Sequence, residues 1–179
     1  MKELSLNILD VAKNSVSAGA SLIEISLNED GDGILTLIIK DDGCGMSEET
    51  LRGVTDPFYT TRTTRKVGMG LPLLKMAAEQ TGGALKITSS QKEGESGTEL
   101  CATFDTKSID FMPIGDIIST ICILIAGSPD IDFDFKDVSP EHTVGLKTTE
   151  LRAVLGDISL AESEIQQWMK EYLEEQYKN

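Results

Sequence analysis

The chain has 179 residues, of which 40% are hydrophobic and 26% are charged, and this composition is typical of a folded globular protein. Its formal net charge of −14 argues against a nucleic-acid-binding surface, because phosphate backbones are bound by clustered Lys and Arg. No apolar run reaches the roughly 20 residues that span a bilayer, and polar residues throughout 1–15 do not fit a signal peptide. We therefore expect a cytoplasmic protein that binds neither nucleic acid nor membrane.

The distribution of cysteines and charges adds two expectations. Cys44, Cys101 and Cys122 lack the spacing of metal ligands and cannot all pair, so they are interpreted as small buried residues in a reducing compartment. Most of the negative excess falls in residues 109–179, whereas the one concentrated basic cluster lies at 62–66. A cationic cluster in so acidic a chain indicates a local anionic ligand.

The first part of the chain predicts a helix followed by a β-hairpin. Residues 3–18 place apolar side chains on one stripe, which predicts an amphipathic helix with Asp10 and Asn14 one turn apart on a common face. Alternating apolar residues predict strands at 23–27 and 34–40, joined by an acidic, glycine-containing turn.

Further elements complete a first module, 1–108. Ser47 is a candidate cap for a short helix, and residues 55–68 lack periodicity and are expected to form a loop. A helix is expected over 71–80, followed by two strands at 84–89 and 98–104.

The remainder, 109–179, is expected to be an acidic α+β extension. It contains a buried segment at 114–126, strands near 131–136 and 143–147, and helices that begin at Thr149 and Glu162. In the last helix, apolar residues recur at helical spacing, namely Ile165, Trp168, Met169 and Tyr172. This stripe is interpreted as packing against the chain's own domain, with a partner surface as the alternative.

The sequence Asp41-Asp-Gly43-Cys-Gly45-Met46 directly follows the second expected strand. A carboxylate at this point can accept a charge-assisted hydrogen bond from an exocyclic amine such as that of adenine. Gly43 and Gly45 would let the backbone approach a flat ring closely. The alternative is an ordinary tight turn.

The polar face of the first helix offers groups for metal and water chemistry. Asn14 provides a neutral oxygen ligand for Mg²⁺, an ion that takes only one or two protein groups and fills its other positions with water and phosphate oxygens. Asp10 could orient or deprotonate an attacking water as a general base. The alternative for both residues is a solvated helix face.

A Gly-x-Gly sequence, Gly68 to Gly70, precedes the helix expected at 71–80, and free N–H groups at a helix start suit phosphate oxygens. This motif is weak by itself, and the chain has no P-loop sequence. Arg62, Arg65 and Lys66 lie just upstream, where they could close over a terminal phosphate. The alternative role of these cations is loop solubility.

Taken in order over about residues 4–105, these motifs resemble the GHKL superfamily. That superfamily includes histidine-kinase catalytic domains, anti-sigma-factor kinases, type II topoisomerases, MutL-type mismatch-repair ATPases and ninety-kilodalton heat-shock chaperones. Residues 9–20 are similar to the N box, and 41–45 match the G1 box. Residues 56–62 look like the F box of histidine kinases, and 68–71 look like their G2 box.

The resemblance implies a two-layer α/β sandwich of a mixed sheet and helices, with ATP and Mg²⁺ as its ligands. It places Asn14 at the magnesium-binding asparagine and Asp41 at the aspartate that contacts adenine. The nucleotide-binding residues that it implies are Asn14, Asp41, Gly43, Gly45, Met46, Phe58, Thr61, Gly68, Met69, Gly70 and Leu71.

Within the superfamily, the chain has features of different branches. MutL-type and chaperone members carry a glutamate as hydrolytic base where this chain has Asp10, which is shorter by one methylene. The F box and short lid resemble the kinase branch. A kinase's phosphoacceptor is an exposed helical histidine, whereas the one histidine here, His142, stands in Ser-Pro-Glu-His-Thr and is interpreted as a satisfied loop residue.

The expected function is that of an Mg-ATP-binding protein kinase acting on a partner in trans. Arg62 and Lys66 would offset developing charge, and Asp10 is the possible base. The alternative is an ATP-gated interaction module or slow ATPase switch without phosphotransfer. The expected partner is an unidentified protein, for which residues 109–179 are the candidate docking region, and a homodimer is the candidate assembly of the chain itself.

Overall fold

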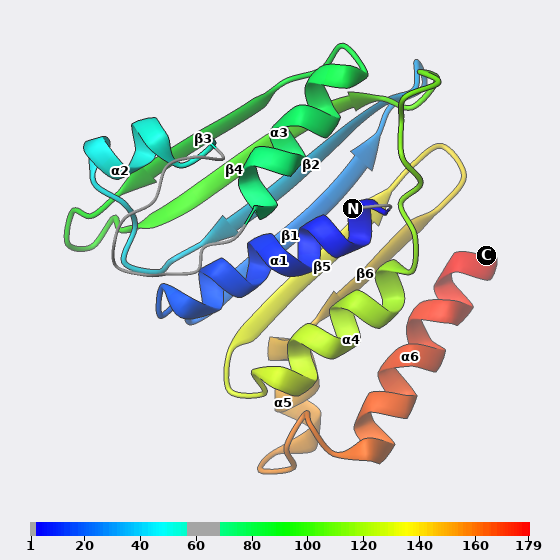
Figure 1. Ribbon diagram of the computed structural model, residues 1–179. Helices are drawn as coiled ribbons and strands as arrows, with labels where there is room; N and C mark the ends of the chain where they lie inside the picture. The colour runs from blue at the N-terminus through cyan, green and yellow to red at the C-terminus, as the bar shows by residue number, and fades with distance from the viewer. Residues whose placement is uncertain (1–2, 57–68) are drawn as a thin grey trace.

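The computed structural model describes residues 3–56 and 69–179, which form one mixed sheet with helices packed on it (Figure 1). The six strands of this sheet lie in the order β3-β4-β2-β1-β5-β6. The strands are β1 Leu22–Glu29, β2 Ile34–Asp41, β3 Leu85–Ser90, β4 Gly97–Asp105, β5 Asp132–Val138 and β6 Thr143–Lys147. The helices are α1 Leu4–Ser17, α2 Glu48–Gly53, α3 Gly70–Gln80, α4 Ile117–Gly127, α5 Thr148–Leu155 and α6 Ser163–Lys178. The predicted α/β fold is confirmed.

Strand pairing determines how the helices are arranged. β1 pairs antiparallel with β2 and parallel with β5, so Ile25 lies between Ile39 and Phe135. Because α1 precedes β1 and α4 precedes β5, this parallel pairing sets α1 and α4 side by side on one face of the sheet. Across that face the helices follow the order α3, α1, α4, α6 (Figure 1).

The hydrophobic core lies between the sheet and this helical layer. Alternate residues of β1 point into it, and Ile23, Ile25 and Leu27 are each at most 1% exposed. The same period-two pattern buries Leu35 and Leu37 of β2, because successive strand residues face opposite sides of a sheet. This alternation fixes the register of the hairpin that ends at Asp41.

Residues 109–179 continue the sheet and the helical layer. β5 and β6 extend the sheet beyond β1, while α4 and α6 extend the row of helices beyond α1. Helix α5 is tied to the start of β5 by Arg152, whose Nε lies 2.7 Å from Asp132 Oδ1. The division of the chain into a domain, 1–108, and an extension, 109–179, stays a prediction. Strands from both segments belong to one continuous sheet.

Cysteine burial differs from the expectation at one position. Cys122 is buried, and this burial raises the pKa of its thiol. Cys101 is half-buried, whereas Cys44 is exposed because it lies in the turn after β2, so its interpretation as a buried residue is wrong. All three are free thiols. Over residues 3–56 and 69–179, no helix combines the length and apolar character that crossing a membrane requires.

Asp42 ties the end of β2 to the start of β1, and this contact predicts a pH-dependent contribution to stability. Its carboxylate accepts hydrogen bonds from Ser21 N and Oγ at 2.7 and 2.5 Å and from Leu22 N at 3.0 Å. Partial burial opposes ionisation, but these hydrogen bonds outweigh it and hold the pKa of Asp42 below its usual value.

Because the pKa is lower in the folded state, the contribution is present above the unfolded pKa of about 4 and is lost as pH falls. We expect Asp42→Asn to lower the free energy of unfolding by about 1 kcal/mol at neutral pH, a modest value because the site is open to solvent. Urea denaturation of both proteins at pH 7 and pH 3 measures this difference. An equal difference at the two pH values would contradict the assignment.

Candidate nucleotide-binding site

Asp41 is the last residue of β2 and contacts the C-terminal half of α1. Each oxygen of its carboxylate accepts a hydrogen bond. The residue is 9% exposed. Ser15 Oγ donates a hydrogen bond of 2.6 Å to Asp41 Oδ2, and Gly43 N donates one of 2.9 Å to Oδ1. These neighbours fix the carboxylate orientation and leave acceptor capacity on both oxygens. The carboxylate is therefore positioned to receive the amine of a ligand.

The turn after β2 packs so closely against neighbouring backbone that two of its positions have room only for glycine. A β-carbon at Gly43 would lie 2.9 Å from the Ala18 carbonyl oxygen. At Gly45, whose φ is +73°, a β-carbon would lie 1.9 Å from the Ser90 carbonyl oxygen. The turn thus packs between the end of α1 and β3, and this packing requires glycine at both positions. Close approach of the turn to a flat ligand ring stays a prediction.

Met46, the next residue, is held through its backbone. Met46 N donates a hydrogen bond of 2.8 Å to Ser89 Oγ, and that hydroxyl donates one of 3.0 Å to the Gly97 carbonyl. Ser89 therefore joins the turn to both β3 and β4. Met46, predicted to contact nucleotide, is thus held by its backbone near the end of β2 where Asp41 lies.

The start of α3 meets α1 beside Asp10. Asp10 and Asn14 are both exposed on α1, one turn apart. A β-carbon at Gly70 would lie 3.3 Å from Asp10 Cβ, so glycine lets the two helices approach closely. Met69 is the residue before the helix and has no side-chain cap, and Leu71 is buried. The start of α3, where backbone N–H groups have no acceptor within the helix itself, thus lies beside the polar face of α1.

Other predicted residues lie outside the part of the chain that the structure describes. They are Phe58, Thr61, Arg62, Arg65, Lys66 and Gly68. The described candidates fall into two groups, the Asp41 turn and the Asp10–Asn14 face beside α3. Ser15 connects these groups, because it follows Asn14 in sequence and contacts Asp41 in space.

Sequence reasoning missed Ser15, Ser89 and Gly97. Gly97 has a φ of +143°, and a β-carbon there would lie 2.1 Å from the Asp41 carbonyl oxygen. The signals for Ser15 and Ser89 depend on contacts across 26 and 43 positions. One weak local signal existed for Ser15, because a serine on the buried side of an amphipathic helix needs a hydrogen-bond partner.

The donor set is compatible with Mg²⁺ only as an ion shared with a phosphate ligand. Among the described residues, no group of three or more His, Cys, Asp or Glu is arranged to hold a metal. Asn14 offers a single exposed amide oxygen. Mg²⁺ commonly takes one or two protein ligands and completes its octahedron with water and phosphate oxygens, so Asn14 fits that role.

The Ser15 hydroxyl is expected to act as a positioning group for Asp41. Ser15→Ala removes one of the two donors that orient the carboxylate, and we expect ATP affinity to fall about 3- to 10-fold, the value of one hydrogen bond. Isothermal titration measures this change. Ser17→Ala, at an exposed position on the same helix, serves as the control. Unchanged affinity in Ser15→Ala would show that the carboxylate needs no such support.

The chain matches the family of histidine kinase-, DNA gyrase B- and HSP90-like ATPases over residues 1–108. The match covers more than half of the chain, which therefore belongs to this family. The sequence-based identification is confirmed, and so is the expectation of an ATP-binding domain of the kind found in ATP-dependent kinases and ATPases.

Curated relatives include several sensor kinases. The chain is 31% identical over 94 residues to sporulation kinase E of Bacillus subtilis strain 168, covering 52% of this chain and 12% of the relative. It is 28% identical over 94 residues to sensor histidine kinase ZraS of Klebsiella oxytoca, covering 52% and 20%. It is 33% identical over 100 residues to sensor protein SrrB of Staphylococcus aureus strain COL, covering 52% and 17%. The chain thus spans a fifth or less of each relative.

A solved structure, the N-terminal domain of a DNA repair protein, has a similar fold. Its TM-score is 0.57 at 13% identity, and the similarity covers 82% of this chain and 52% of that chain. At this identity the likeness concerns the fold alone. It covers more of the chain than the family match does, so it includes part of residues 109–179.

His142 lies between β5 and β6, remote from the elements that carry the candidate site. Its Nε2 lies 3.2 Å from Asp137 Oδ1, and its Nδ1 lies 3.2 Å from Ser139 Oγ. Its ring meets the ring of Tyr177 edge-on at 5.0 Å. This packing joins the end of α6 to the β5–β6 hairpin. His142 lies in the loop as expected, but of its two ring nitrogens only Nδ1 has a hydrogen-bond partner, and the buried Nε2 has none within the described residues.

Proposed function

We propose that this chain binds Mg-ATP at the end of β2 and transfers the terminal phosphate to a separate protein in the cytoplasm. The observation that carries the proposal is the buried Asp41 carboxylate at the end of β2, which Ser15 and Gly43 fix in orientation. Ser15 belongs to α1, the helix that the start of α3 meets at Asp10. Such a site suits a ligand with an amine at one end and phosphates at the other. The kinases among the curated relatives support phosphotransfer.

The proposed catalysis rests on positioning and charge neutralisation. Asp41 holds the adenine amine, and the first N–H groups of α3 face the phosphates. The bond from the γ-phosphorus to the bridging oxygen breaks while a partner side chain bonds to that phosphorus. ADP leaves with the bridging oxygen and its electron pair, and the acceptor proton passes to solvent. Arg62 and Lys66, outside the described residues, are proposed to offset the charge that develops.

Asn14 is the residue that would hold Mg²⁺, which supplies charge neutralisation to the phosphates when bound. We expect Asn14→Ala to reduce ATP affinity in Mg²⁺ to the value that the natural protein shows in EDTA, because the metal-dependent contribution is removed. Titration of both proteins with ATP in each buffer measures this. Ser17→Ala is the matched control. An Asn14→Ala protein that keeps its Mg²⁺-dependent affinity would refute the metal assignment.

A slow ATPase switch is the second candidate function, and the position of Asp10 favours it. Asp10 is exposed and adjoins the start of α3, where a terminal phosphate and an attacking water would lie. In this case water, rather than a partner side chain, attacks the γ-phosphorus with Asp10 as general base. ATP binding and release would then control partner contacts without phosphotransfer.

ATP labelled at the γ-phosphate separates these functions. The purified protein is incubated with Mg²⁺ and labelled ATP, and free phosphate and protein-bound label are followed together. The kinase proposal predicts saturable ATP binding with almost no phosphate release in the absence of a partner. Release that continues over many turnovers and disappears in Asp10→Asn would instead establish the ATPase switch. Absence of ATP binding would contradict both functions.

A further inference from the structure

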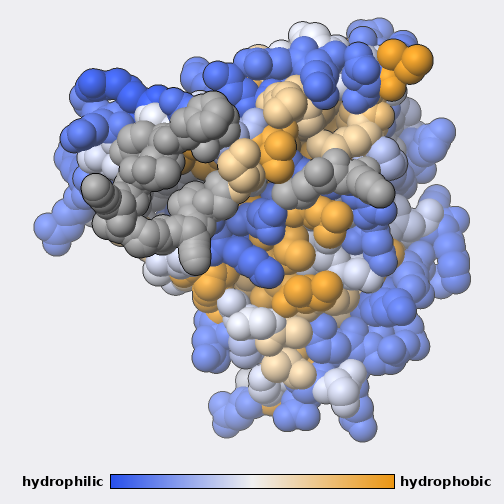
Figure 2. All heavy atoms as spheres, in the orientation of Figure 1, coloured by the Kyte–Doolittle hydropathy of each residue, from blue (hydrophilic) through white to orange (hydrophobic). Residues whose placement is uncertain are grey.

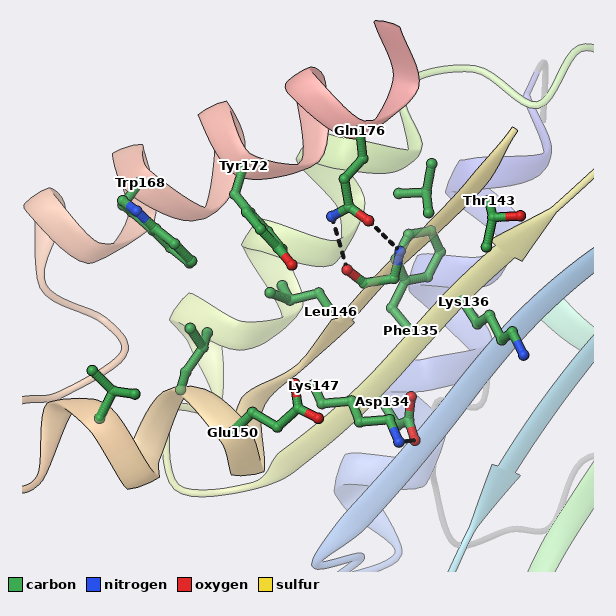
Figure 3. Close-up of a pocket in the computed structure, with 14 residues that line it drawn as sticks. Asp134, Phe135, Lys136, Thr143, Leu146, Lys147, Glu150, Trp168, Tyr172 and Gln176 are labelled. Atoms are coloured by element: carbon green, nitrogen blue, oxygen red, sulfur yellow. Dashed lines mark hydrogen bonds and ion pairs between the residues drawn. The ribbon is translucent and has the colours of Figure 1, made fainter. Parts of the chain in front are cut away.

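A groove of about 590 Å³ lies at the far edge of the sheet from β3 (Figure 3). Its walls are β5, β6, α5 and α6, all from residues 109–179. Trp168, Tyr172 and Gln176 point from α6 toward β6, while Glu150 lies on α5 opposite them (Figure 3). This groove is separate from the elements that carry the candidate nucleotide site.

Exposed aromatic side chains line the α6 wall. Trp168 is 46% exposed and Tyr172 is 42% exposed, and their rings stack with centroids 4.8 Å apart and planes 11° apart. Met169 and Leu173 of the same helix are fully buried. The prediction that this stripe packs against the chain's own domain is therefore confirmed for Met169 and wrong for the two aromatic residues. Exposed Trp and Tyr are typical anchors of protein interfaces.

The β6 wall is the edge strand of the sheet, and the side chain of Gln176 is hydrogen-bonded to the backbone of Gly145 on the open side of this strand. Gly145 N donates a hydrogen bond of 2.9 Å to Gln176 Oε1, and Gln176 Nε2 donates one of 2.9 Å to the Gly145 carbonyl. The Gln176 carboxamide therefore makes the two backbone hydrogen bonds with Gly145 that a residue of a neighbouring strand would make. In an antiparallel edge strand, alternate residues present N–H and C=O groups outward, so Thr143 and Lys147 present theirs on the same side as Gly145.

An acidic row borders the aromatic residues. Glu164, Glu171 and Glu175 follow one another at spacings of seven and four, so they form one row along α6, and all three are exposed. Trp168 lies four residues after Glu164 and belongs beside this row. Lys147 in the groove lies 3.9 Å from Asp134 and is already paired. Lys136 also lines the groove, and Lys178 ends α6 three residues after Glu175, so the rim beside Trp168 is acidic up to this last turn.

We propose that this groove binds an extended segment of a partner protein in which basic and aliphatic residues alternate. The segment pairs with β6 in the place of Gln176, its aliphatic side chains contact the Trp168–Tyr172 stack, and its cations face the acidic row. A second copy of this chain is a poor occupant, because two acidic rims would repel each other in a chain of net charge −14. The proposal is independent of the nucleotide site.

A pair of synthetic peptides tests this proposal with the natural full chain. One peptide alternates Lys and Val, and the other alternates Glu and Val at the same length. Trp168 is the single tryptophan of the chain, so its fluorescence reports the groove directly. We expect a saturable fluorescence change with the Lys-Val peptide that weakens with added salt, and none with the Glu-Val peptide.

Substitutions in the groove give the decisive comparison. Tyr172→Ala should weaken Lys-Val binding at least 5-fold, whereas Gln176→Ala should tighten it several-fold because the competing carboxamide is gone. Met76→Ala, at a similarly exposed apolar residue on α3, should leave the affinity unchanged. Thermal unfolding by circular dichroism confirms that each variant is folded, and the Gly145 amide signal in NMR reports pairing at β6.

Several outcomes would overturn the proposal. Equal effects of the Lys-Val and Glu-Val peptides would refute charge recognition. Unchanged affinity in a folded Gln176→Ala protein, or an unmoved Gly145 signal, would refute pairing with β6. Sedimentation that shows a dimer of the natural chain, lost in Tyr172→Ala, would assign the groove to a second copy instead.

Discussion

Asp41→Asn is expected to lower ATP affinity about 10- to 100-fold, the largest effect of any single substitution in the candidate site. The change removes the negative charge that strengthens the hydrogen bond to the adenine amine, a bond worth about 1.5–3 kcal/mol. It also replaces one acceptor oxygen with a donor, so the hydrogen bond with the Ser15 hydroxyl must reverse its direction if Gly43 N is to keep its acceptor. Isothermal titration with ATP measures the affinity.

Asp42→Asn is the matched control for this prediction. The two carboxylates are adjacent in sequence, but Asp42 contacts the start of β1 rather than the turn. We expect Asp42→Asn to bind ATP with natural affinity. If Asp41→Asn, shown by its thermal unfolding to be folded, also binds ATP normally, Asp41 does not recognise the nucleotide.

Gly45→Ala is expected to cause the largest loss of stability, at least about 2 kcal/mol in the free energy of unfolding. The residue has a φ of +73°, which costs an alanine about 1 kcal/mol, and its β-carbon would overlap the Ser90 carbonyl oxygen at 1.9 Å. The turn must move away from β3, which would also displace Asp41 and lower ATP affinity. Urea denaturation and ATP titration measure the two effects.

Gly94→Ala separates backbone strain from the steric clash. Gly94 has a similar φ of +83°, but nothing lies within 4 Å of the position that its β-carbon would take. We expect this variant to lose only about 1 kcal/mol and to keep its ATP affinity. Equal losses in Gly45→Ala and Gly94→Ala would mean that close packing of the turn against β3 contributes nothing.

Much of the fold could be predicted because its local patterns are strong. The alternation of Ile23, Ile25 and Leu27 specified both the strand and its buried face. Ser47 was expected to cap a short helix, and its hydroxyl accepts a hydrogen bond of 3.1 Å from Thr50 N. The end of a strand at Asp41 and the turn that contains Gly45 could also be predicted, since these residues are close in sequence.

Non-local contacts could not be predicted from these patterns. The parallel pairing of β1 with β5 joins segments separated by more than a hundred residues, and no local periodicity specifies it. The contact of Ser15 with Asp41 likewise joins residues far apart in sequence, so no local pattern specifies it. Burial within α6 was also undetermined, because helical spacing puts Trp168 and Met169 on neighbouring parts of one stripe, and only the contact with α4 and β6 decides which is covered.

Hydrogen exchange measured by mass spectrometry, with and without Mg-ATP, tests the central claim most directly. Bound nucleotide should slow exchange of backbone amides in three segments, the middle of α1, the turn at 41–46 and the first turn of α3. Exchange in β6 and α6 should stay unchanged. Protection that is absent from the turn at 41–46, or that is confined to residues 109–179, would contradict a nucleotide site at the end of β2.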